Sequence, residues 1–359
     1  MKTSFTIAAS ILSIFTLATL ANATIHTVNN NLNGPGIFTS IQAAHDAASS
    51  GDTIYLAASP SGYGGATLSK KIALFGAGMR PIEKKDNSAS SFLIGNISLV
   101  SGSDGSQIVG INFSGRGLTI DNNVSNCQLL RNNFTNGCNM VQFNGGSYSG
   151  WLIANNFFNQ DACCCTAING QNQTFTNFLI QNNVFTDNTS CQCGDFVLRG
   201  FGSTANCIFS NNLVYSNEAG DNAFGSVSNF IMENNIFHTA SPGGASNSVM
   251  NNNITFGTNQ NTLPYGSNSG LNNVSNTDPQ LTTFINTTKN PFQNFQPSAG
   301  PAKTGGVNGT QMGVYGGGFN WNNSAVPPIP AIKSFSITSG STVPSGGSMT
   351  IKVTATKQN

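Results

Sequence analysis

Residues 178–188 read FLIQNNVFTDN, and four other stretches of the chain repeat its central motif with little change. They are LLRNNFTN at 129–136, LIANNFFNQ at 152–160, IFSNNLVYSN at 208–217 and IMENNIFHT at 231–239. With the second Asn as reference, the series runs through Asn112, Asn133, Asn156, Asn183, Asn212, Asn235 and Asn253. Recurrence every 18 to 29 residues indicates a repeat protein.

Apolar residues stand at fixed places relative to this reference Asn. The positions four before, three before and one after it are apolar in all seven repeats, whereas the position two before it varies freely. We therefore expect the apolar columns to stack inside the molecule and the variable column to face solvent.

The segments between the repeats decide which kind of solenoid this is. Stretches such as TNGCNMVQFNGGSYSG at 135–150 are rich in Gly, Asn and β-forming residues, so they are poor helices. A leucine-rich repeat would require an LxxLxL pattern and often a helix in each unit. Short strands joined by tight turns and stacked about 4.8 Å apart fit better, and we predict an all-β, right-handed parallel β-helix of eight to ten coils.

The Asn pair itself has a structural explanation. Asn tolerates the left-handed backbone conformation that a sharp turn between strands often needs. Its amide also carries both a donor and an acceptor, so stacked Asn side chains can form a hydrogen-bonded ladder along the solenoid. We interpret the repeat as structural chemistry rather than as an active-site signature.

Both ends of the predicted solenoid carry distinct signals. Thr39-x-x-Gln42 matches a capping box, and Ile41, Ala44, His45 and Ala48 would share one face of a short capping helix that Gly51 closes. We expect His45 to pack at the rim of this cap. Residues 326–359 combine a Pro-rich connection with a sequence that alternates like a short C-terminal β-hairpin.

The first 23 residues have the features of a secretory signal peptide. Lys2 precedes an apolar region, and Ala21-Asn22-Ala23 fits the small-x-small cleavage pattern. We expect the mature chain to start at Thr24, with a β-helix domain over 24–325, and to be secreted or on the cell surface. No later segment is long and apolar enough to span a membrane.

Composition limits the possible partners. Only 8% of residues are charged and the formal net charge is +1, so no basic surface for nucleic acid is expected. The chain instead has about fifty Asn and 40 Gly. We expect a monomer whose polar surface consists mainly of amides and hydroxyls.

The eight cysteines fit an oxidising compartment. Their spacing lacks the paired CxxC pattern of a zinc site, so disulfides are the preferred interpretation. Counted from the reference Asn, two loops leave neighbouring coils at similar places, which predicts cross-coil bridges among Cys163, Cys164, Cys165, Cys191 and Cys193, with Cys138 joining from the coil below. Cys127 and Cys207 lie too far apart to bridge and stay unassigned.

The segments FTSIQAAHDAASSGDTIYLAASPSGYGG at 38–65 and KKIALFGAG at 70–78, followed by the LIxNNxF coils, carry a family likeness. Over roughly residues 24–300 the chain resembles secreted bacterial β-helix proteins of the pectin-lyase-like superfamily. That superfamily includes lyases, hydrolases, esterases and adhesins, so the resemblance implies a fold more strongly than an activity.

One charged constellation is a candidate site. Aligning the strands on small-residue turns pairs Asn144, Asn169, Arg199 and Gly225, which makes Asp195 and Asp221 vertical neighbours. Alternation would then place Asp195, Val197 and Arg199 outside. Two carboxylates with Glu218 nearby would suit Ca²⁺, and Arg199 could orient an acidic sugar or act as the base of a lyase. A purely structural role, in which Arg199 neutralises the acidic pair, is the alternative.

Three classes of function stay open: a secreted protein that binds extracellular polysaccharide, a structural or adhesive surface solenoid with no small ligand, and a glycan-degrading enzyme. We prefer binding or adhesion, with an extracellular glycan or another cell-surface component as the partner. Exposed Trp151, Tyr148 or Trp321 could stack on sugar rings in such a protein. The alternative is a polysaccharide lyase or another glycan-degrading enzyme of pectin-lyase-like type, with Asp195, Asp221 and Arg199 as candidate catalytic residues.

Overall fold

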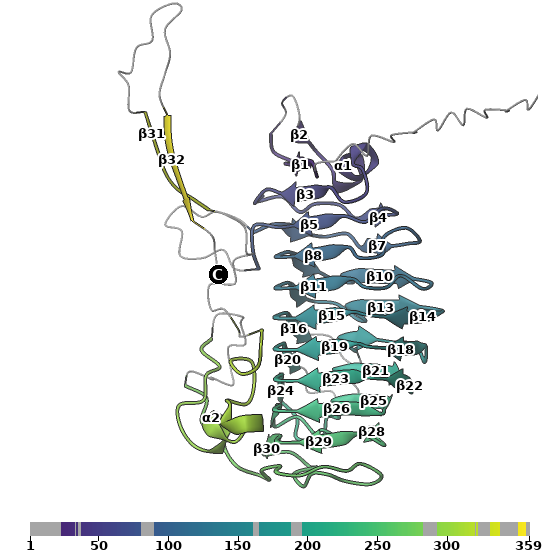
Figure 1. Ribbon diagram of the computed structural model, residues 1–359, viewed down its shortest axis with the longest axis vertical. Coiled ribbons are helices and arrows are strands. Elements are labelled where there is room, and N and C mark those ends of the chain that lie inside the picture. The colour runs from purple at the N-terminus through teal and green to yellow at the C-terminus, as the bar shows by residue number, and fades with distance from the viewer. Residues whose placement is uncertain are drawn as a thin grey trace, which may run out of the picture.

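The computed structural model describes residues 23–32, 34, 37–79, 90–160, 165–187, 196–282, 293–319 and 321, together with two strands near the C-terminus. The chain forms the predicted all-β parallel β-helix, with strands stacked one coil above another along the long axis (Figure 1). Between residues 107 and 256, the described part of the chain contains strands and turns but no helix.

Three long parallel sheets form the sides of the solenoid, and we call them sheets A, B and C. Sheet A has eleven strands, in the order β2 (Ile37–Phe38), β1 (Ile25–Val28), β3 (Thr53–Leu56), β5 (Ala73–Phe75), β8 (Gln107–Val109), β11 (Gln128–Leu130), β15 (Leu152–Ala154), β19 (Leu179–Gln181), β23 (Cys207–Ser210), β26 (Phe230–Glu233) and β29 (Val249–Asn251). Sheet B has eight strands, β6 (Phe92–Leu93), β9 (Asn112–Ser114), β12 (Asn133–Thr135), β16 (Phe157–Gln160), β20 (Val184–Asp187), β24 (Leu213–Ser216), β27 (Ile236–His238) and β30 (Ile254–Phe256).

Sheet C also has eight strands, β4 (Ala66–Leu68), β7 (Ile97–Leu99), β10 (Leu118–Asp121), β13 (Val141–Asn144), β17 (Ile168–Asn169), β21 (Leu198–Phe201), β25 (Phe224–Ser228) and β28 (Ala245–Ser246). A small sheet D contains β14 (Ser147–Ser149), β18 (Thr174–Thr176) and β22 (Ser203–Ala205). The strand numbers agree with the predicted eight to ten coils.

The core is built from columns of inward-facing side chains, one from each successive strand of a sheet. On sheet A the inward column is Ile54, Leu74, Ile108, Leu129, Ile153, Ile180, Phe209, Met232 and Met250, each at most 1% exposed. On sheet B, the rings of Phe113, Phe134, Phe158 and Phe185 stack with centroids 4.7, 4.8 and 4.9 Å apart. These spacings match the distance between neighbouring strands.

The two residues of each Asn pair have different structural roles. The first takes a left-handed conformation at the turn from sheet A to sheet B, with φ of 55° at Asn155, 54° at Asn182 and 53° at Asn211. The second forms a buried amide ladder in which each side-chain oxygen accepts from the backbone and side-chain N–H groups of the coil before it. The ladder is Asn132, Asn156, Asn183, Asn212, Asn235, Asn253 and Asn273.

The predicted alignment was wrong by one residue in the first two repeats. Asn112 and Asn133 are not in the ladder; they begin β9 and β12 and pair in register with Phe157. Gly110 and Arg131 take the left-handed position there, with φ of 70° and 55°. The ladder therefore begins one residue earlier, where the backbone N–H of Ile111 donates to Asn132.

Two of the predicted interior columns face outward in the later coils. Leu152, Leu179 and Ile208 are half-buried on the outer face of sheet A, and Ile231 and Val249 are each 38% exposed. On sheet B the outward residues Phe157, Val184, Leu213, Ile236 and Ile254 are buried under Phe295, Ala302, Met312, Val314 and Trp321. The segment 293–321 therefore forms a second, smaller core against the outside of sheet B.

This covering segment contains α2 (Pro301–Thr304) and the short 3₁₀ helix η1 (Val307–Gly309), and it runs beside β20 to β30 (Figure 1). It is held by the left-handed Asn residues. The amide of Asn182 donates to the carbonyls of Val314 and Gly316 at 2.9 and 2.6 Å, and the amide of Asn252 donates to Gly305 at 2.8 Å. The turn residues thus serve both the solenoid and its cover.

The N-terminal cap is the helix α1 (Ile41–Ala47), which lies over the first coil (Figure 1). Its N-cap is Ser40, whose hydroxyl accepts from the N–H of Ala43 at 3.2 Å; the predicted cap, Thr39, stands one residue earlier. Ile41 and Ala44 join the main core, and His45 is only 3% exposed, as predicted.

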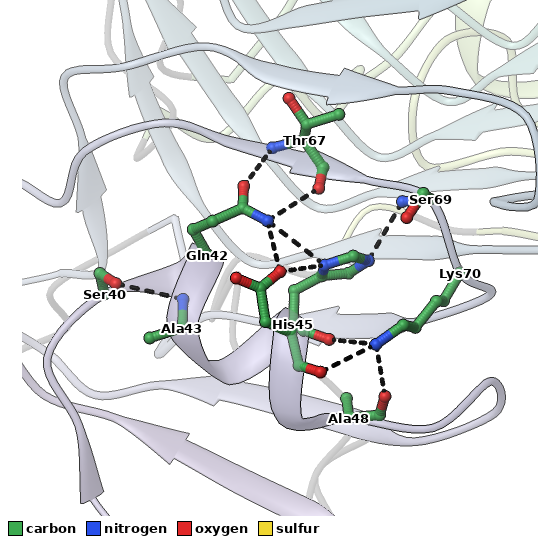
Figure 2. Close-up of polar contacts among 9 residues, drawn as sticks. Ser40, Gln42, Ala43, His45, Ala48, Thr67, Ser69 and Lys70 are labelled. Carbon is green, nitrogen blue, oxygen red and sulfur yellow. Dashed lines mark hydrogen bonds and ion pairs between the residues drawn. The ribbon is translucent and has the colours of Figure 1, made fainter.

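Figure 2 shows how polar contacts fasten this cap to the solenoid. The N–H of Ser69 donates to His45 Nε2 at 3.1 Å, and the N–H of Thr67 donates to Gln42 Oε1 at 2.8 Å. The ammonium of Lys70 donates to the carbonyls of His45, Asp46 and Ala48 at 2.8 to 3.0 Å, which satisfies the C-terminal end of the helix.

Two further predictions concern the C-terminus and the cysteines. β31 (Ala331–Ile337) and β32 (Ile351–Thr356) pair antiparallel, which confirms the hairpin. Cys138 and Cys165 form a disulfide between neighbouring coils, whereas Cys127 and Cys207 are buried and free. Cys163, Cys164, Cys191 and Cys193 lie outside the described residues, so their predicted bridges stay predictions. No helix in the described ranges is long and apolar enough to cross a membrane.

Candidate functional site

The outer face of sheet C carries polar side chains in register on six successive strands. We call this set the polar row, and its members are Thr67, Ser98, Thr119, Gln142, Asn169 and Arg199. All six are half-buried or exposed, whereas their neighbours along the strands, such as Val141, Phe143 and Leu198, are buried. Strand alternation therefore separates an apolar inner face from a continuous polar outer face.

A second line of polar groups holds the polar row in place. Asn96 donates to Ser98 Oγ at 3.0 Å and accepts from Thr119 Oγ1 at 3.3 Å. Farther along, Gln142 donates to Asn144 Oδ1 at 2.7 Å, and Asn169 donates to Asn139 Oδ1 at 3.1 Å. These bonds orient the amides and hydroxyls before any ligand arrives.

Arg199 ends the polar row and is its one charged member. It pairs in register with Asn169 on one side and Gly225 on the other, as predicted, and it is exposed. Gly225 has no side chain, so the space beside the guanidinium on the next coil is not filled from that position.

The predicted register of this face needs two corrections. Gln142, not Asn144, pairs with Asn169, because β17 is two residues shorter than β13 and the Asn-Gly turn that guided the alignment follows it two residues earlier. Val197 was expected outside but is 0% exposed, because it precedes β21 and does not follow that strand's alternation.

Of the three acidic residues in the predicted site, Asp221 and Glu218 lie in the described part of the chain. Asp221 is 1% exposed, and its Oδ2 accepts from the hydroxyl of Ser216 at 2.8 Å. Its N–H donates to the carbonyl of Glu218 at 3.1 Å, so both residues belong to one turn after β24. Asp195 lies outside the described residues, so its predicted contact with Asp221 stays untested. Among the described residues, no three His, Cys, Asp or Glu gather as metal ligands would.

The aromatic residues expected to stack on sugars are buried. Tyr148 and Trp151 are each 1% exposed, and their polar tips donate inward, Trp151 Nε1 to Val124 O at 2.9 Å and Tyr148 OH to Gly145 O at 2.5 Å. Burial raises the pKa of Tyr148 to about 12. Trp321 is 4% exposed and packs against Phe295. The expectation of exposed rings was therefore wrong.

The sequence did contain a signal for this burial. Trp151 directly precedes β15, at the position that Phe178, Cys207 and Phe230 occupy in the following coils, and all of them are buried. The polar row itself was missed beyond Asn169 and Arg199, because it depends on the register of short strands that carry no Asn pair.

Comparisons with known proteins do not identify a function for the polar row. No protein-family model matches the chain, and neither the curated proteins nor the solved structures contain a match. The proposed function therefore depends on the chemistry of the site and on the patterns of the sequence.

Proposed function

We propose that this protein binds an extracellular polysaccharide along the polar row. The supporting observation is the register of six outward hydroxyl, amide and guanidinium side chains on successive coils. Such groups donate to and accept from sugar hydroxyls. Neighbouring coils lie about 4.8 Å apart, which is comparable with one residue of an extended polysaccharide, so successive sugars would meet successive coils.

Two features narrow the class of glycan. Arg199 is the charged member of the row, and a guanidinium forms its strongest hydrogen bonds with carboxylates or other anions. The buried positions of Tyr148 and Trp151 exclude these two rings from stacking on a bound sugar. We therefore expect an acidic polysaccharide, recognised through hydrogen bonds and one ion pair.

A glycan array followed by calorimetry on the purified chain would test this proposal. Arg199→Ala should weaken binding of an acidic oligosaccharide about 10- to 100-fold, since a hydrogen bond to a charged group is worth about 1.5–3 kcal/mol. Gln142→Ala and Asn169→Ala should each weaken it about 2- to 10-fold.

Thr174→Ala provides the matched control. Thr174 is an exposed residue on sheet D, in register with Ser147 and Ser203, and it lies outside the polar row. Equal losses in this control and in Arg199→Ala, or no acidic glycan on the array, would contradict the proposal.

A lyase is the second candidate, because Arg199 stands exposed on a strand face where it could remove a proton from an acidic sugar. Asp195 and Asp221 would then be its partners. The same purified chain, incubated with acidic polysaccharides, would release unsaturated products that absorb ultraviolet light. Absorbance that grows with time and disappears in Arg199→Ala would favour catalysis over simple binding.

Calcium binding by Asp195, Asp221 and Glu218 belongs to this proposal too. Added Ca²⁺ should raise the melting temperature of the protein, and Glu218→Gln should reduce that rise. Glu218 is half-buried at the surface of its turn, so its replacement should leave the fold intact. A melting temperature that does not change when Ca²⁺ is added would contradict a calcium site at these residues.

The likeness of residues 38–78 and the coil repeats to the pectin-lyase-like superfamily, and the signal-peptide pattern of residues 1–23, support an exported glycan-binding protein of that type. The disulfide between Cys138 and Cys165 is compatible with an oxidising compartment. Export could be tested directly by N-terminal sequencing of the protein recovered from the medium.

A further inference from the structure

We propose that hydrolysis of the peptide bond between Ala23 and Thr24 creates an α-ammonium group that binds the carboxylate of Asp52 and locks the first coil. This inference concerns maturation of the chain and does not depend on the proposed glycan site. It assigns Asp52 as the receptor of a new N-terminus.

The position of Thr24 is fixed from two sides. Its backbone nitrogen donates to Asp52 Oδ1 at 2.8 Å, and its carbonyl accepts from the N–H of Thr53 at 2.9 Å. Thr24 directly precedes β1, which pairs in parallel with β3 from Ile25 and Thr53 onward. The nitrogen that cleavage would release therefore already lies against Asp52.

Asp52 has the surroundings of a buried anion. Only 6% of the residue is exposed, and its Oδ2 accepts from the N–H of Ser49 at 2.8 Å and lies 3.0 Å from Nε2 of His26. His26 is the titratable side chain in contact with this carboxylate among the described residues. The pKa of Asp52 is lowered to about 2, first by the N–H of Thr24, then by Ser49 and His26. The group is therefore ionised at neutral pH.

Cleavage converts the neutral hydrogen-bond donor at Thr24 into a positively charged one beside the Asp52 carboxylate. Water adds across the bond, so the carbonyl carbon of Ala23 becomes a carboxylate and leaves with the leader, and the nitrogen of Thr24 gains protons to become an ammonium. A neutral amide donor is thereby replaced by a cation with three N–H groups at the same place. Charge-assisted hydrogen bonds are roughly twice as strong as neutral ones.

The sequence and exposure of the Ala23–Thr24 peptide bond also suit cleavage by a leader peptidase. Ala21-Asn22-Ala23 fits the preference of a leader peptidase for small residues before the cut, and both Ala23 and Thr24 are exposed. The contact joins β1 and β3 at the N-terminal end of the solenoid, beside α1, so its strengthening would add to the cap that covers the first coil.

The experiment compares two chains, one beginning at Thr24 and one with a short Gly-Ser extension before Ala23, each with and without Asp52→Asn. Acetylation of the α-amine is followed by mass spectrometry as a function of pH, in the folded protein and in urea. An ordinary α-amine has a pKa of about 7.7–8.0.

In the folded chain that begins at Thr24, we expect this pKa to rise by about one unit, so that acetylation at pH 7 is about tenfold slower than in urea. The extended chain and the Asp52→Asn chain should show no such protection. The chain that begins at Thr24 should also melt at a higher temperature than the extended chain.

Equal reactivity of the folded and unfolded amine would overturn the proposal, as would equal protection in the Asp52→Asn chain. If Asp52→Asn does not fold, the comparison of the folded chain with its urea-unfolded form still decides the matter, because it needs no substitution.

Discussion

Replacing one rung of the amide ladder should destabilise the whole solenoid, and Asn183→Ala is the sharpest test. Asn183 is 0% exposed. Its side chain takes part in five hydrogen bonds. Its amide donates to Ile153 O, Gln181 O and Asn212 Oδ1 at 2.9, 3.0 and 3.1 Å, and its oxygen accepts from Asn156 N and Nδ2 at 2.9 and 3.0 Å.

The loss can be estimated from these bonds. The substitution leaves the buried N–H of Asn156 without its acceptor, at a cost of about 1–3 kcal/mol, and each remaining bond contributes about 1 kcal/mol. Asn156 Nδ2 keeps its bonds to Leu129 O and Ala154 O, so part of the network survives. We therefore expect Asn183→Ala to lower the free energy of unfolding by about 4–6 kcal/mol.

Asn177→Gly is the matched control in the same coil. Asn177 is exposed and has a φ of 53°, a conformation that Gly adopts without strain. Its replacement should change the free energy of unfolding by less than about 1 kcal/mol. Urea unfolding followed by circular dichroism would measure both variants, with the slope of the transition checked for constancy. A loss below about 1 kcal/mol in Asn183→Ala would refute the structural role of the ladder.

Three further predictions concern the cap, the disulfide and acid stability. Lys70→Met removes three hydrogen bonds to the end of α1 and should cost about 1–2 kcal/mol in urea unfolding, whereas Lys71→Met, at an exposed neighbour, should cost little. Cys138→Ser opens a bridge between residues 27 apart and should cost about 3 kcal/mol in the same assay, and an unchanged midpoint would show that the bridge does not stabilise the fold. The pKa of Asp52 is lowered to about 2 in the folded chain, so its contribution to stability is complete above its unfolded value of about 3.9 and is lost as pH falls toward 2. Melting temperatures measured across this range should fall less steeply in Asp52→Asn than in the unchanged protein.

The Asn pairs made the fold predictable because they report two local requirements at once. A left-handed turn residue and a stackable amide are both properties of single residues, and they recur at Asn155–Asn156, Asn182–Asn183 and Asn211–Asn212 without any need for long-range information. The same reasoning was wrong at Asn133, because Arg131 replaced Asn at the turn and shifted the pair by one residue.

The face of each strand was harder to predict than its existence. Leu152 and Ile153 are both apolar and adjacent, yet Ile153 is buried in the core while Leu152 is half-buried on the outside. Phe157 and Phe158 are both buried, one beneath the 293–321 segment and one inside the solenoid. Hydrophobicity cannot separate these cases, because a second apolar surface exists wherever a distant segment covers the sheet.

The high Asn content of the chain is also weak evidence for ligand binding, because many Asn side chains are needed by the fold itself. Many of the amides that make this sequence unusual are not available to a ligand. Those of the ladder, such as Asn183 and Asn212, are buried and bonded within the solenoid, and turn amides such as Asn182 bind the covering segment. An abundance of Asn would therefore be expected in this fold even if it bound nothing. The polar row differs because its side chains face outward and do not fill the core. Asn169 also accepts from the N–H of Gln171 at its own turn, so Gln142 is the better probe. A loss of glycan binding in Gln142→Ala with an unchanged melting temperature would distinguish recognition from architecture.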